Sequence, residues 1–120
     1  MAGVVVTVPK QLWAEWIAEG DLPGEDWSGS EFAFYIGGRV PFIGPGERVY
    51  VVAHGKLRGY APLVRVRPGA LIRAGNAVAV TINEPIPGFR GWRYRWWKRE
   101  AERPFAEWKD VQPVGGLFGA

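Results

Sequence analysis

The hydrophobic and polar positions at the start of the chain predict one strand and one helix. Residues 3–8 are rich in β-branched valine, which favours an extended strand. Residues 10–19 carry apolar side chains at three- and four-residue spacing with polar side chains between them, which predicts an amphipathic helix. Pro9 suits the start of that helix, and Gly20 suits the position just after its end.

The middle of the chain alternates short apolar stretches with glycine and proline, a pattern that is typical of small β proteins. Gly55 and Lys56 form a tight connection between two such stretches, which we expect to pair as a hairpin. The almost wholly apolar residues 76–82 are expected to form a central strand. Further short strands are expected at residues 31–36, 40–43, 48–54 and 57–66.

The C-terminal third differs in character from the rest. Residues 104–109 fit a short helix with proline at its first position, and the glycine-rich residues 114–120 are expected to form a flexible tail. Residues 1–113 are therefore predicted to form a single domain. The expected fold class is mixed α+β, mainly β: a small, partly closed β-barrel of about five or six short strands, with an early helix and a short C-terminal helix.

Composition excludes several kinds of chemistry. The chain has 120 residues, no cysteine and one histidine, His54. Disulfides, thiolate metal sites, cysteine nucleophiles and histidine-built zinc sites are thereby excluded, and we expect neither a metal nor a cofactor. No apolar stretch is long enough for a membrane span and none looks like a signal peptide. We therefore expect no membrane partner and a reducing, cytoplasmic location.

Charge is distributed unevenly along the sequence. Residues 1–47 carry two basic and seven acidic side chains, whereas residues 48–120 carry thirteen basic and five acidic ones. Arginine supplies eleven of the fifteen cations, and its planar guanidinium binds phosphate and stacks on aromatic rings. A polyanion is therefore an expected partner. An arginine-rich composition can also reflect genome composition or adaptation to heat.

Residues 89–99 combine five aromatic and five cationic side chains in eleven positions. Aromatic rings and guanidinium groups stack on unpaired bases while the cations contact phosphates, so the block predicts a surface for single-stranded nucleic acid. Alternatively, the aromatic residues complete the core and the arginines form its solvated face. The predicted nucleic-acid-binding residues are Arg90, Trp92, Arg93, Arg95, Trp97, Lys98 and Arg99.

Four residues outside that block are candidates for a cleft beside the sheet. Trp27 lies in a polar loop, where a large ring either plugs the loop or stacks on a planar ligand. Arg39 follows the Gly37-Gly38 bend and can contact an anion. Lys56 and Arg58 flank the predicted hairpin turn. For the three cations, the alternative is an ordinary solvated surface charge.

No catalytic residue is assigned from the sequence. Glu25, Asp26 and Glu31 lie close together along the chain and can supply a general base, but acidic loop residues are mostly solvated. His54 can act as a general base or form a structural hydrogen bond. No phosphate-binding loop motif is present.

The stretch Gly46-Glu47-Arg48-Val49-Tyr50-Val51-Val52-Ala53-His54-Gly55-Lys56-Leu57-Arg58-Gly59-Tyr60-Ala61 resembles the central hairpin of the PUA-like superfamily. With the early strand and helix and the late basic segment, the chain looks most like the ASCH and EVE branches. That resemblance implies a barrel-like fold that binds RNA or modified bases, and some ASCH members act as ribonucleases or as amidohydrolases on a modified cytidine. The Gly-x-Lys-x-x-Glu-x-Arg motif expected after the helix of an ASCH protein is absent, since residues 19–26 lack the lysine and the arginine.

Together, these features predict a module that binds RNA or a modified nucleotide, and favour a protein that is not an enzyme. A small ASCH-like hydrolase and a protein-interaction domain are the alternatives.

Overall fold

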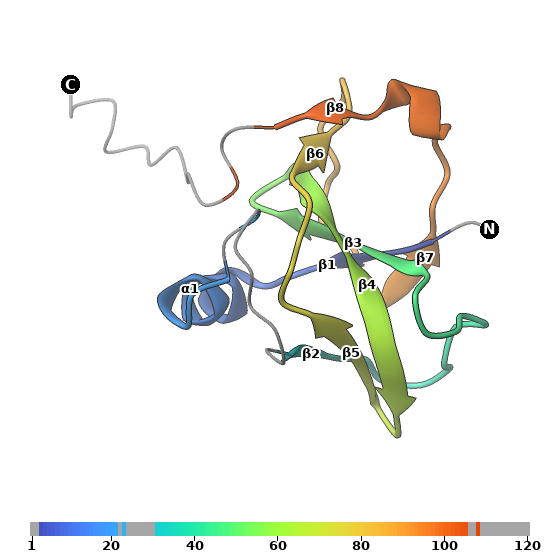
Figure 1. Cartoon of the computed structure of the whole chain (residues 1–120). Helices are drawn as coiled ribbons and strands as arrows, with labels where there is room; N and C mark the ends of the chain where they lie inside the picture. The colour runs from blue at the N-terminus through green and yellow to red at the C-terminus, as the bar shows by residue number, and fades with distance from the viewer. Residues whose placement is uncertain (1–2, 22, 24–30, 106–107, 109–120) are drawn as a thin grey trace.

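The computed structural model describes residues 3–21, 23, 31–105 and 108, which fold around a six-stranded sheet (Figure 1). The helix α1 (Lys10–Ala18) follows the first strand. Across the sheet, the strands are β2 (Glu31–Tyr35), β5 (Ala70–Ala74), β4 (Lys56–Arg67), β3 (Arg48–Ala53), β1 (Val4–Thr7) and β7 (Trp92–Tyr94). A separate two-stranded sheet pairs β6 (Val80–Thr81) with β8 (Arg103–Pro104), and the 3₁₀ helix η1 (Arg99–Ala101) precedes β8. The predicted mainly β class is confirmed.

The main sheet is mixed and open. β1 runs parallel to β3, whereas its other neighbour, β7, and all the remaining pairs are antiparallel. Within the described part of the chain, β2 and β7 are the edge strands and no backbone pairing joins them. Backbone hydrogen bonds between the edge strands therefore do not close the sheet into the predicted barrel.

Side chains of the central strands alternate between two apolar layers, as expected for a strand with both faces buried. One layer lies between the sheet and α1 and contains Val4, Val6, Val49, Val51, Trp13, Trp16 and Trp108. The other lies beneath the segment that follows β6 and contains Val5, Tyr50, Val52, Leu57, Ile82, Ile86 and Trp97. The segment from Ile82 to Trp97 is thus packed onto the sheet.

The early helix forms where the apolar periodicity predicts it, one residue shorter than expected. Trp13 and Trp16 are buried against the first layer, because they lie three residues apart on one face of α1. Gly20 has a φ of 95°, the left-handed conformation that commonly ends a helix and that glycine adopts without steric cost.

The predicted hairpin between β3 and β4 is also confirmed, but its two-residue turn is His54-Gly55, one residue earlier than expected, because Lys56 already pairs with Ala53 as the first residue of β4. His54 and Gly55 have φ values of 52° and 77°, so both central residues are left-handed, as in a type I′ turn. The register shifts between Val51 and Val52, where β4 has one extra residue, Arg58, between the partners Leu57 and Gly59. A Cβ at Gly59 would lie 2.2 Å from the carbonyl oxygen of Val78, so only glycine allows that close approach.

Two strand predictions in the middle of the chain are wrong. Residues 76–82 do not form a central strand: Val78 makes an isolated bridge to Tyr60, and only Val80–Thr81 forms a short strand, β6. The sheet instead contains β5 (Ala70–Ala74), which pairs with β2 and β4. Residues 40–43 form no strand either.

The C-terminal predictions have mixed outcomes. The helix predicted from residue 104 does not begin there, because Pro104 pairs with Val80 in the β6–β8 sheet. Residues 106, 107 and 109 lie outside the described residues, as do the tail at 114–120, the proposed boundary at 113 and the candidate Trp27.

Candidate nucleic-acid interface

Part of the aromatic and basic block forms an edge of the main sheet. Trp92, Arg93 and Tyr94 constitute β7, opposite Val6, Val5 and Val4 of β1. Tyr94 is 45% exposed and Arg93 is exposed, whereas Trp92 is half-buried against the first apolar layer. Because alternate side chains of a strand lie on the same face, the rings of Trp92 and Tyr94 lie on one side, with an edge contact at 4.8 Å between centroids.

A groove of about 470 Å³ lies along this edge, between β7 and the segment that follows β2. We call it the edge groove, and it brings the cleft candidate Arg39 together with three of the predicted nucleic-acid-binding residues, Arg90, Trp92 and Arg93. Its lining contains three arginines, two aromatic rings and no acidic side chain. The lining residues are Gly37, Arg39, Arg90, Gly91, Trp92, Arg93 and Tyr94.

Two hydrogen bonds hold the walls of the edge groove together. Trp92 donates its Nε1–H to the carbonyl oxygen of Arg39 at 2.8 Å, and the backbone N–H of Phe42 donates to the Tyr94 hydroxyl oxygen at 2.9 Å. The single N–H of Trp92 is therefore already used. What the two aromatic side chains chiefly offer a ligand is ring surface, together with the hydroxyl hydrogen of Tyr94.

The arginines of the groove are not paired with acidic side chains of the described residues. Within the described part of the chain, no carboxylate forms an ion pair with Arg39, Arg90 or Arg93. The guanidinium carbon of Arg93 lies 4.5 Å from the ring centroid of Phe89, which orients the side chain by a cation–π contact. The groove thus presents concentrated positive charge beside flat apolar surfaces.

The remaining predicted binding residues lie elsewhere. Trp97 is buried beneath the sheet, and the side chain of Arg95 is only 14% exposed. Arg58 is also buried and donates its Nε–H to the carbonyl oxygen of Ala53 at 3.0 Å. Lys98 and Arg99 are exposed at the start of η1, and Lys56 is exposed at a second pocket described below.

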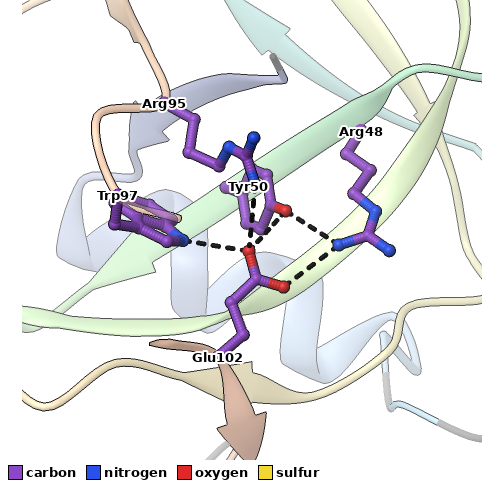
Figure 2. Close-up of polar contacts among 5 residues, drawn as sticks. All are labelled: Arg48, Tyr50, Arg95, Trp97 and Glu102. Carbon is purple, nitrogen blue, oxygen red and sulfur yellow. Dashed lines mark hydrogen bonds and ion pairs between the residues drawn. The ribbon is translucent and has the colours of Figure 1, made fainter. Parts of the chain in front are cut away.

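Trp97 and Arg95 belong instead to a polar cluster centred on Glu102 (Figure 2). One carboxylate oxygen of Glu102 accepts hydrogen bonds from the Tyr50 hydroxyl at 2.6 Å and from Trp97 Nε1 at 2.9 Å, while the other accepts one from Arg48 at 3.0 Å. Arg95 lies 3.7 Å from the same carboxylate. Burial and the hydrogen bond to Glu102 raise the pKa of Tyr50 above its ordinary value. The Glu102 cluster ties residues 95–102 to β3.

A second polar pair lies inside the first apolar layer. The carboxylate of Asp21 forms an ion pair with Arg73, and both side chains are almost fully buried. The Arg73 guanidinium lies against the rings of Trp16 and Phe32, which contact each other, at 4.6 Å and 4.8 Å from their centroids. Burial raises the pKa of Asp21 and lowers that of Arg73, because desolvation outweighs their mutual attraction.

Sequence reasoning missed both polar clusters. In each cluster an acidic residue joins a strand partner more than fifty residues away, so spacing along the chain carries no sign of these contacts.

No metal centre is found among residues 3–21, 23, 31–105 and 108, since no three acidic or histidine side chains there gather to hold an ion. In the same ranges, no helix has the length and apolar character needed to cross a membrane.

Comparison of the chain with protein-family models, with curated proteins and with solved structures found no match. The resemblance to the PUA-like superfamily stays a prediction, and the function is inferred from the geometry of the site.

Proposed function

We propose that the protein binds single-stranded RNA through the edge groove. The observation that carries the proposal is the lining of the groove, where Arg39, Arg90 and Arg93 accompany two aromatic rings and no acidic residue. Guanidinium groups bind phosphates, and exposed rings stack on unpaired bases. We also propose that the fold is PUA-like. In this proposal, the hydrogen bonds of Trp92 and Tyr94 to the segment after β2 join the two edges of the sheet, in place of the backbone pairing that would close a barrel.

The contacts within the groove favour binding with little base selectivity. Trp92 donates its only N–H to Arg39, so it offers a ligand only its ring surface. Stacking on an aromatic ring is available to every base and therefore discriminates little between them. Selective recognition would need donors and acceptors directed at base edges. We therefore expect affinity to depend on strandedness and salt more than on sequence.

The test is binding of a fluorescein-labelled single-stranded RNA, measured by anisotropy over a series of salt concentrations. Three phosphate contacts predict a slope of log affinity against log salt near −2, at about −0.7 per contact on a single strand. Arg39→Gln, Arg90→Gln and Arg93→Gln should each weaken binding and flatten the slope by about 0.7. Lys10→Gln removes one exposed charge from α1 and is the control, which should keep both the affinity and the salt slope close to those of the wild type.

A ring substitution separates stacking from charge. Tyr94→Leu should cost about 1 to 3 kcal/mol of binding free energy while leaving the salt slope unchanged, because stacking releases no counterions. Unchanged binding in all three arginine variants, each verified to be folded, would contradict the proposal.

The same samples distinguish the alternatives. Cleavage of the RNA, or loss of the acyl group from N4-acylated cytidine, would favour the ASCH-like hydrolase. Capture of a polypeptide without salt-sensitive RNA affinity would favour the protein-interaction domain.

A further inference from the structure

We infer that a second pocket, separate from the edge groove, binds a nucleoside 5′-monophosphate. This pocket of about 510 Å³ lies between the β6–β8 sheet, the segment after β6 and the β3–β4 turn. Its volume falls in the range of small-molecule sites. We call it the β6–β8 pocket, and its lining residues are Lys56, Thr81, Ile82, Asn83, Glu84, Pro85, Arg103, Pro104 and Phe105.

Backbone pairing brings the polar side chains of the pocket together. Thr81 lies directly opposite Arg103 in the β6–β8 register, so their side chains share one face of that small sheet. Arg103 donates a hydrogen bond of 2.6 Å to the side-chain oxygen of Asn83. The backbone N–H of Ile86 donates to the carbonyl oxygen of Gly55 at 2.9 Å, which holds the loop beside Lys56.

The polar groups of the pocket are mostly hydrogen-bond donors. Lys56 and Arg103 are cations, and no described carboxylate forms an ion pair with either. Asn83 uses its oxygen to accept from Arg103, which leaves its amide hydrogens to donate. Glu84 is the one acidic side chain of the lining, so the pocket carries a net positive charge. Such a donor set fits the oxygens of a phosphate group.

The remaining lining is apolar and suits a planar ring. Phe105 contributes an aromatic ring, with Pro85, Pro104 and Ile82 around it. Its backbone N–H donates to the carbonyl oxygen of Ala79 at 3.2 Å, which fixes its position at the end of β8. A phosphate joined to a flat apolar body satisfies both halves of the lining, and a nucleotide has that composition.

The experiment is titration of the ¹⁵N-labelled protein with adenosine or uridine 5′-monophosphate, followed by amide chemical shifts. Saturable shifts are expected at Lys56, Thr81, Asn83 and Arg103, with weaker binding of inorganic phosphate and of the unphosphorylated nucleosides. Lys56→Gln and Arg103→Gln should each weaken nucleotide binding about five- to tenfold, and Phe105→Leu by a similar factor. Arg93→Gln, in the edge groove, should bind the nucleotide like the wild type.

The possible outcomes are distinct from those for RNA binding. No saturable shifts at the pocket, or unchanged affinity in the folded Lys56→Gln variant, would overturn the inference. Inorganic phosphate that binds as tightly as the nucleotide would also overturn it, since the ring would then contribute nothing. RNA affinity that depends on Arg93 while nucleotide affinity does not would support two separate sites.

Discussion

At the scale of single residues, the buried pair Asp21 and Arg73 is the least expected feature of the core. Arg73 lies on β5 among apolar neighbours, with its guanidinium against two aromatic rings. Asp21 Oδ1 and Arg73 Nε find no hydrogen-bond partner in the described part of the chain. Each charge is therefore stabilised mainly by the other, and removal of one partner leaves the other buried without compensation.

A double-mutant cycle measures this dependence. Asp21→Asn and Arg73→Met should each reduce the free energy of unfolding by about 3 kcal/mol or more, because each leaves one uncompensated buried charge. The double variant should lose clearly less than the sum, as measured by urea denaturation. The exposed pair Glu31 and Arg65 is a matched control, for which neutralising either residue should cost less than about 1 kcal/mol. Additive losses at Asp21 and Arg73 would contradict this account.

At the scale of elements, local patterns predicted the early helix and the β3–β4 hairpin, because spacing and turn residues determine both. The strand β5 was missed because Arg73 interrupts its apolar pattern, and the partner that permits its burial lies 52 residues away. Residues 76–82 are apolar, yet Gly59 packs against their backbone and only Val80–Thr81 pairs as a strand. The basic block was recognised, but sequence could not show that Trp97 and Arg95 turn inward to Glu102.

The hairpin turn offers a test of its own. His54→Asn should raise the free energy of unfolding by about 0.5 to 1 kcal/mol, since Asn-Gly is a preferred pair for a type I′ turn. Burial, together with Arg58 and Lys10, lowers the pKa of His54 in the folded protein. The unfolded chain therefore takes up a proton more readily, and the wild type loses stability as pH falls below about 6.5.

The His54→Asn variant should not lose stability in this way as the pH falls, because it has no imidazole to protonate. Thermal unfolding between about pH 5 and 7 measures the difference. His54→Ala is the control: it removes the titration but has no preference for the left-handed turn. The control should therefore be less dependent on pH without gaining stability at pH 7. If the unfolding temperatures of the wild type and of His54→Asn change in parallel with pH, the role assigned to His54 is contradicted.

At the scale of the whole molecule, the Glu102 cluster connects segments that are distant in sequence. Tyr50 and Arg48 belong to β3, whereas Trp97 and Arg95 lie on the connection between β7 and η1. The carboxylate of Glu102 thus fixes residues 95–102, which we call the C-terminal segment, against β3 (Figure 2). Both the edge groove and the β6–β8 pocket adjoin this segment, so its attachment affects both candidate sites.

Glu102→Gln should therefore loosen the C-terminal segment as a unit. Glutamine keeps the shape but removes the charge that faces Arg48 and Arg95, at an expected cost of about 1 to 3 kcal/mol in unfolding free energy. Hydrogen exchange should accelerate at the amides of Arg95, Ala101 and Glu102 while the β3–β4 hairpin keeps its protection. Glu100→Gln, an exposed change in η1, should leave the unfolding free energy and the exchange rates unaltered. Uniform acceleration throughout the sheet would argue against a local anchor.

The position of β1 in the sheet has a consequence for the order of folding. The first strand of the chain lies between β3 and β7, and Val4 pairs with both Val49 and Tyr94. As the chain leaves the ribosome, β1 can acquire its second neighbour only after β7 (Trp92–Tyr94) has also emerged. Until then, its buried valines keep one unpaired edge, which is the condition that favours association between incomplete chains. Completion of the sheet thus depends on contacts distant in sequence, which form slowly.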